Sequence, residues 1–255
     1  MHIVAAGVRL DGFGLVLGVV LGCYLVAGQP FVGAWNARRF RIRARTDPRA
    51  RLDRYHRTII LEWALVVVAL LVIVASGDIS PGDLGLTTPG FTGGALPYTL
   101  VGFVGLALST AGLAALRGRV PAAGRAVRGP SAVLDLMPRT TAERRTFAAV
   151  AVTAGICEEL LYRGFGLAVL AALAPDVGPA RTIGVAAVGF GLAHAYQGAA
   201  GIVVTAILGG CLAVLFLGTG SLLLPIAYHV LIDLRVLIVP VLPLRRSGEA
   251  VPDGA

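Results

Sequence analysis

The chain has 255 residues, of which 56% are hydrophobic and 14% are charged, and its formal net charge is +8. A soluble domain carries about a quarter of charged residues, so this composition indicates a membrane protein. All 22 basic residues are arginines, and they cluster between apolar runs, which argues against a nucleic-acid-binding surface.

Seven apolar stretches approach or reach the roughly 20 residues that a transmembrane helix requires. In chain order they cover residues 12–35, 58–76, 98–116, a stretch that begins near 146, and then 182–196, 202–217 and 222–239. The fourth is expected to break at Gly164, leaving 165–174 as a short separate helix. The first exceeds the apolar run of a signal peptide and ends in no small-residue cleavage site, so we expect an uncleaved span. The predicted fold is an all-α polytopic membrane helix bundle with about seven transmembrane helices.

The arginines predict how this bundle is oriented in the membrane. Nine of them fall within 38–57 and seven within 117–145, whereas 77–97 contains none. Since arginine-rich loops stay on the cytoplasmic side, both loops are expected there, with the N-terminus outside and the tail inside. The expected location is the plasma membrane of a bacterium. Lipid is therefore a partner of the chain, and arginine loops also suit anionic headgroups.

The last four apolar stretches contain a small set of ionisable side chains, namely Glu158, Glu159, Arg163, His194, His229 and Asp233. Four of these side chains carry a formal charge, and together they would cost on the order of 10 kcal/mol if they were unpaired in lipid. They are Glu158, Glu159, Arg163 and Asp233. Side chains of this kind usually mark a transport pathway or a catalytic centre.

Spacing predicts which of these groups meet. Glu159 and Arg163 are four residues apart and share a helix face, which favours an ion pair. Glu158 points about 100° away from Glu159 and has no partner nearby in the sequence. The pairs Phe190 and His194, and His229 and Asp233, repeat the four-residue spacing.

The residue types suit hydrolysis without a covalent intermediate. A carboxylate in a low-dielectric site can take a proton from a water molecule that attacks a carbonyl. One histidine could orient that water or protonate the leaving amine, and the other could donate to the oxyanion. Asp233 could hold the imidazole of His229 in one tautomer.

Metal-assisted hydrolysis is the alternative version of this chemistry. Glu158, His194 and His229 are acceptable zinc ligands, and zinc would activate the water itself. The sequence lacks H-E-x-x-H, the clearest signature of a zinc protease. No cofactor is certain from the sequence. The residue types are compatible both with hydrolysis by a carboxylate without metal and with zinc-assisted hydrolysis.

Three motifs in order resemble the CPBP family, which includes the type II CAAX prenyl endopeptidases and bacterial bacteriocin-processing or self-immunity proteins. They are E-E-x-x-x-R at 158–163, F-x-x-x-H at 190–194 and H-x-x-x-N/D at 229–233. The resemblance covers about 143–233, and the first three spans match only as generic membrane helices.

The resemblance implies a glutamate-dependent intramembrane endopeptidase, with its active site between the fourth, fifth and seventh helices. By this resemblance, Glu158 would activate water with the help of His194. The oxyanion would be bound by His229 and Asp233, and the site would be supported by Glu159 and Arg163. Phe190 would also be a supporting residue. The eukaryotic-type enzymes have asparagine where this chain has Asp233, and an ionised aspartate cannot donate to an oxyanion.

The expected organisation is one integral membrane domain with three parts. Residues 1–142 form the N-terminal transmembrane helices and arginine-rich loops, 143–242 the CAAX-protease-like core, and 243–255 a disordered tail. The expected substrate is a membrane-associated peptide or protein end. The alternatives are a non-catalytic immunity or scaffold protein of the same family and a proton-coupled transporter, which would use the same groups as a relay.

Overall fold

The computed structural model describes residue 10 and residues 12–76, 80–91, 93–118 and 135–238, with the backbone alone for 112–118. All the regular secondary structure in these residues is helical. The α-helices are α1 (Gly12–Cys23), α2 (Gln29–Arg43), α3 (Ala50–Ala75), α4 (Leu96–Gly118), α6 (Thr141–Glu159), α7 (Leu167–Leu173), α8 (Pro179–Ala193), α9 (Ala199–Thr219) and α10 (Leu223–Ile238). Two π-helical segments, Tyr24–Gly28 and Leu160–Gly166, and a short 3-10 turn, Ala195–Gln197, connect some of them.

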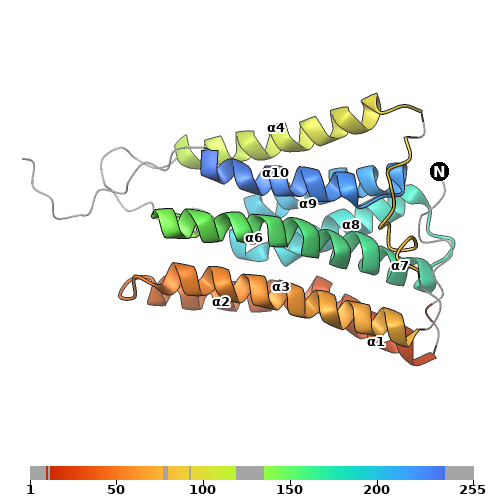
Figure 1. The fold of residues 1–255 in the computed structure, drawn as a ribbon, viewed down its shortest axis with the longest axis horizontal. Helices are drawn as coiled ribbons and strands as arrows, with labels where there is room; N and C mark the ends of the chain where they lie inside the picture. The colour runs from red at the N-terminus through yellow and green to blue at the C-terminus, as the bar shows by residue number, and fades with distance from the viewer. Residues whose placement is uncertain (1–9, 11, 77–79, 92, 119–134, 239–255) are drawn as a thin grey trace, which may run out of the picture.

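The helices run roughly along the long axis of the molecule (Figure 1). Helices α1, α2 and α3 form one side of the bundle, and α4 and α10 form the opposite side. Between them lies α6, which packs against both α3 and α10, while α8 and α9 pack against each other. The helix that holds the paired glutamates is therefore central to the bundle.

The predicted helical fold is confirmed, since each predicted apolar stretch overlaps a described helix over most of its length. Within the described part of the chain, three helices are long and apolar enough to cross a membrane, namely the continuous Gly12–Arg43, Ala50–Ala75 and Ala199–Thr219. Two more, Leu96–Ala111 and Pro179–Ala193, are apolar but shorter. The chain is an integral membrane protein, and the count of seven crossings stays a prediction.

The first helix is longer than the predicted stretch and contains a π-helical segment. It continues past residue 35 to Arg43 and widens at Tyr24–Gly28, just before Pro30. A proline has no N–H and its ring collides with the carbonyl four residues earlier, so an extra residue in the preceding turn lets the helix continue.

The predicted break at Gly164 is wrong, because the chain stays helical there. Helix α6 begins with a capping box in which Thr140 and Glu143 bond each other's backbone N–H groups. After Glu159 the helix widens into the π-helical segment Leu160–Gly166 and then continues as α7. Gly164 serves close packing instead, since a Cβ atom there would lie 3.2 Å from the carbonyl oxygen of Leu84.

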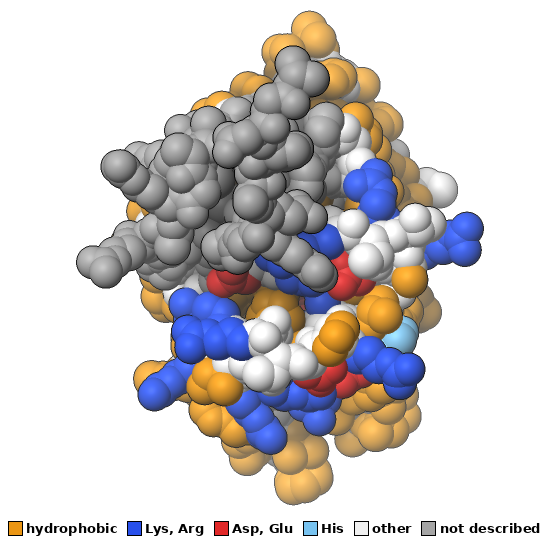
Figure 2. Space-filling model, turned by 90° about the vertical axis from the view of Figure 1, so that its left-hand side faces the viewer, with side chains coloured by type: hydrophobic (Ala, Val, Ile, Leu, Met, Phe, Trp, Pro, Cys, Tyr) orange, Lys and Arg blue, Asp and Glu red, His pale blue; other side chains and the backbone are white. Residues whose placement is uncertain are grey.

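Arginines gather at one end of the bundle, and apolar side chains cover much of the rest of the view (Figure 2). At this end Arg51 bonds Glu143 across 3.1 Å and also donates to the carbonyl of Asp135. The first arginine-rich segment and the described part of the second therefore meet. Residues 119–134 and the predicted tail 243–255 lie outside the described residues. The side of the membrane that this end faces stays a prediction.

Candidate active site

A close approach between α6 and α10 sets the geometry of the site. A Cβ atom at Gly155 would lie 2.4 Å from Cγ2 of Val230 and 3.0 Å from its backbone nitrogen. Only glycine leaves room for this contact, as at other small-residue crossings of membrane helices. The contact places the residues that follow Gly155 on α6 against His229 on α10.

Glu158 lies between two imidazoles without bonding either of them. Its Oε2 atom is 3.8 Å from Nε2 of His194 and 3.9 Å from Nε2 of His229. Both distances are too long for a direct hydrogen bond. The same oxygen is buried and has no hydrogen-bond partner, which is rare for a carboxylate. Its surroundings leave it available to a small polar molecule such as water.

Glu159 is the centre of a fully buried ionic network. It forms the ion pair with Arg163 that their four-residue spacing predicts, at 2.8 Å, and neither side chain is exposed. The same oxygen, Oε1, lies 2.7 Å from Nδ1 of His229. Arg163 also donates to the carbonyl of Gly209 on α9. This network ties three helices together and fixes the orientation of the His229 ring.

The hydrogen bonds at Nδ1 define the roles of the two imidazoles. Nδ1 of His194 lies 2.9 Å from the carbonyl oxygen of Phe190, which can only accept, so Nδ1 carries the proton. Nδ1 of His229 likewise donates to the carboxylate of Glu159. The Nε2 atoms of both rings therefore face Glu158, and the hydrogen bond at each Nδ1 fixes the orientation of its ring.

Phe190 separates and supports these rings. Its ring centroid is 4.7 Å from that of His194 and 5.7 Å from that of His229. The guanidinium of Arg163 lies 4.4 Å from the same centroid, which adds a cation–π contact. A Cβ atom at Gly209 would approach Cβ of Phe190 to 2.9 Å, so glycine is needed there for Phe190 to hold this place.

Asp233 does not lie at Nδ1 of His229, which is bonded to Glu159, so its expected role in holding the tautomer of that ring stays a prediction. Asp233 instead approaches Nε2, with 4.0 Å between that atom and its Oδ2. Its side chain is 34% exposed, against 8% for His229. Helix packing explains the difference, since residue 159 reaches the ring across the α6–α10 contact while Asp233 lies one turn along α10.

Glu62 is a fourth carboxylate near the site, and the sequence motifs do not include it. It lies on α3, its Oε2 atom is buried without a hydrogen-bond partner, and it interacts electrostatically with Glu158 and His229. The signal that could have found it is a glutamate inside the apolar stretch 58–76. Glu62 lies outside the last four apolar stretches, which contain the other candidate residues.

Metal-assisted hydrolysis would need at least three of these donors arranged around one ion. The described residues contain no group of three His, Cys, Asp or Glu side chains arranged as metal ligands, Glu158, His194 and His229 included. As they lie in this structure, these side chains do not form a three-ligand zinc site, and zinc binding stays a prediction.

Comparison with family models matches residues 142–235 to the family described as type II CAAX prenyl endopeptidase Rce1-like. The matched residues, 142–235, are similar to the family that the three sequence motifs resemble. No curated protein and no solved structure matched the chain. This match covers α6 to α10 except for the first residue of α6 and the last turn of α10, so it contains both glutamates and both imidazoles of the site. Glu62 lies outside it. This family supports the function of a CAAX-type intramembrane protease.

Proposed function

We propose that the chain is an intramembrane endopeptidase in which Glu158 activates a water molecule for attack on a peptide carbonyl. The observation that carries the proposal is the buried, unpartnered Oε2 atom of Glu158, which faces two imidazole nitrogens. Oε2 of Glu159 is also buried without a partner, but Oε1 of that residue accepts from Arg163 and lies against Nδ1 of His229. Oε2 of Glu158 differs because it lies between two Nε2 atoms.

The first step uses Glu158 and His194 together. Glu158 takes one proton from water, and Nε2 of His194, whose Nδ1 carries the ring proton, accepts a hydrogen bond from the other water proton. The water oxygen then attacks the carbonyl carbon and gives a tetrahedral intermediate. The backbone bond to Phe190 keeps the ring in place during this step.

His229 stabilises the negative charge on the oxygen of the tetrahedral intermediate. With Nδ1 bonded to Glu159, the ring donates to an oxyanion when Nε2 also carries a proton. Three carboxylates surround that imidazolium, since Glu159, Glu158 and Asp233 all lie within 4.0 Å of the ring nitrogens. Asp233 thus supports the imidazolium without donating to the oxyanion itself.

The second step returns the proton. The carboxylic acid of Glu158 donates it to the nitrogen of the scissile bond, the C–N bond breaks, and a new carboxyl group and a free amine leave. Glu158 is again a carboxylate and no atom of the protein is consumed. No covalent bond between enzyme and substrate is needed.

Exposure suggests where a substrate enters. Glu159 and Arg163 are 0% exposed, Glu158 is 16% exposed and Asp233 is 34% exposed. The site therefore opens towards Asp233, and a membrane-associated peptide or a protein end would reach Glu158 from that side. This is the substrate class that we propose.

The experiment is cleavage by the full chain reconstituted in liposomes with membrane proteins, in water enriched in the heavy oxygen isotope. Hydrolysis predicts new protein ends that carry one heavy oxygen in the new carboxyl group. A chain with Glu158→Gln and His194→Ala together controls for contaminating proteases. If both preparations give the same ends, or neither gives any, the protein is a binder or a transporter and not a protease.

A further inference from the structure

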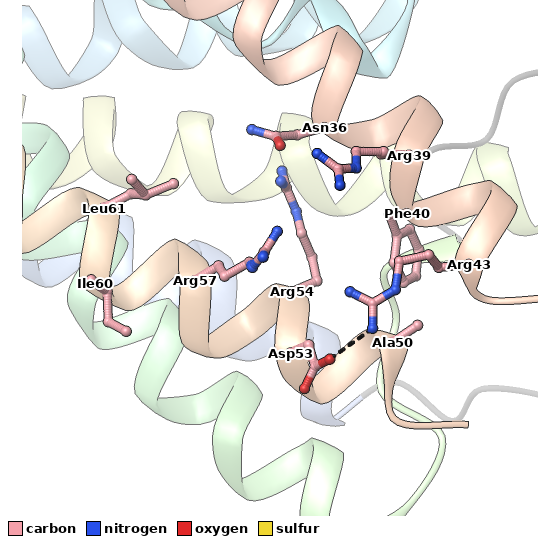
Figure 3. Close-up of a pocket in the computed structure, with 10 residues that line it drawn as sticks. All are labelled: Asn36, Arg39, Phe40, Arg43, Ala50, Asp53, Arg54, Arg57, Ile60 and Leu61. Atoms are coloured by element: carbon pink, nitrogen blue, oxygen red, sulfur yellow. Dashed lines mark hydrogen bonds and ion pairs between the residues drawn. The ribbon is translucent and has the colours of Figure 1, made fainter. Parts of the chain in front are cut away.

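A pocket with a volume of about 290 Å³ lies between α2 and α3 at the arginine-rich end of the bundle, apart from the candidate active site. Four arginines line it, Arg39 and Arg43 from α2 and Arg54 and Arg57 from α3 (Figure 3). The side chain of Asn36 also faces the pocket from α2. This pocket has no role in the proposed hydrolysis.

The positive charge in the pocket is only partly neutralised. Arg43 bonds Asp47 across 2.6 Å and Asp53 across 3.0 Å. Arg54 and Arg57 form no ion pair with any of the described residues. Their side chains lie side by side in the pocket (Figure 3). Because like charges repel at short range, these two guanidinium groups favour an anion between them.

Arginine also selects the kind of anion. Its planar fork of N–H donors matches phosphate and carboxylate oxygens and gives short, charge-assisted hydrogen bonds. The amide of Asn36 adds a further donor on the opposite wall of the pocket. A compact group with several acceptor oxygens would use all these donors at once.

The surroundings of the pocket are those of a lipid-facing surface. Ile60 and Leu61 line it and are 66% and 51% exposed, which suits contact with acyl chains. Trp35 is 58% exposed near the same end of α2, and Arg39 lies 5.0 Å from its ring centroid. Tryptophan and arginine together are typical of the boundary between headgroups and hydrocarbon. Both walls belong to helices that could cross a membrane.

We propose that this pocket binds the phosphate of an anionic phospholipid, with Arg54 and Arg57 on the phosphate and the acyl chains along Ile60 and Leu61. A lipid at this place would bridge α2 and α3. The proposal concerns lipid binding and does not depend on peptide cleavage.

The test is native mass spectrometry of the detergent-purified full chain titrated with dioctanoyl phosphatidylglycerol. We expect one lipid to be retained preferentially and Arg54→Gln with Arg57→Gln to weaken its binding at least about tenfold. The matched control is Arg41→Gln with Arg45→Gln, which removes the same charge from exposed residues at the same end but outside the pocket. Arg57→Gln alone, at an exposed position, keeps the test available if the double variant does not fold.

Four outcomes would overturn the proposal. Equal weakening by the control pair would mean diffuse attraction to the arginine-rich end. Equal binding of dioctanoyl phosphatidylcholine would mean that the pocket has no preference for an anionic headgroup. Competition by inorganic phosphate as strong as that by the lipid would make the ligand a free anion. Displacement by a peptide with a free C-terminal carboxylate, but not by its amide, would make the pocket a peptide site.

Discussion

His229 and Glu159 lie on different helices, and yet Nδ1 of the imidazole is 2.7 Å from Oε1 of the carboxylate. The same oxygen accepts from Arg163, so one buried carboxylate is shared between a permanent cation and a ring. This arrangement gives the second glutamate of the pair a definite role. It holds His229 so that Nε2 faces Glu158.

Removal of Glu159 should damage stability as well as activity. Glu159→Leu leaves the guanidinium of Arg163 buried without its partner, and breaking a buried pair in this way costs about 3–5 kcal/mol. The expected result is a marked fall in the thermal unfolding temperature of the purified protein, together with loss of cleavage.

The double variant Glu159→Leu with Arg163→Leu separates these two effects. With both charges gone, most of the lost stability should return, because an apolar pair can replace a buried ion pair. Cleavage should stay lost, since His229 still has no partner at Nδ1. Recovery of cleavage in the double variant would show that Glu159 acts only through Arg163.

Asp233→Asn should have a small effect. The carboxylate is 34% exposed and 4.0 Å from Nε2 of His229, and a partly exposed ion pair contributes about 0–1 kcal/mol. We expect the cleavage rate to fall by no more than about fivefold. A loss as deep as that caused by a change at Glu158 would mean that Asp233 takes part directly in the chemistry.

Gly155→Ala should impair cleavage through displacement of α10. The new methyl group would collide with Val230, so His229 must move relative to Glu158. A misplacement of about 1 Å at a catalytic group can cost about a hundredfold in rate. The measurement is the cleavage rate of variants with similar expression in the membrane.

Two further variants sharpen this test. Gly184→Ala on α8 is the matched control, because its Cβ atom would meet nothing within 4 Å, and it should leave the rate unchanged. Val230→Ala removes the nearest atom, Cγ2, and should partly rescue Gly155→Ala. If Val230→Ala gives no rescue, and Gly155→Ala and Gly184→Ala lower the rate equally, the close approach does not position His229.

Chelation of metal ions should leave cleavage intact. The described residues offer no three side chains arranged as metal ligands, and the proposed mechanism uses the carboxylate alone as base. We expect dialysis against a chelator to leave the rate unchanged, with elemental analysis showing no stoichiometric zinc. If chelation abolishes cleavage and added zinc restores it, the mechanism is metal-assisted and the carboxylate mechanism is contradicted.

The length and apolarity of the sequence stretches predict the helices well, because burial of backbone groups in lipid leaves few other structures. Four-residue spacing also predicts the ion pair between Glu159 and Arg163, since both lie on one helix. The roles of Glu158, His194 and His229 in catalysis stay predictions, although the structure brings these three side chains together.

The remaining features depend on how helices pack, which spacing cannot show. Glu159 and His229 are 70 residues apart, so only the contact between α6 and α10 reveals their bond. Glu62 reaches the site from a helix outside the matched family region. The π-helical segment after Glu159 has no clear sequence signature, and the sequence favoured a break at Gly164 instead.

The most direct test of the proposed mechanism is the cleavage rate of Glu158→Gln, measured on a substrate found with the wild-type protein. Glutamine keeps the shape of the side chain but cannot take a proton from water, so the rate should fall at least about a hundredfold. The unfolding temperature should stay near that of the wild type, because the Oε2 atom has no hydrogen bond to lose. A folded Glu158→Gln variant that cleaves at the wild-type rate would contradict the assignment of Glu158 as the base.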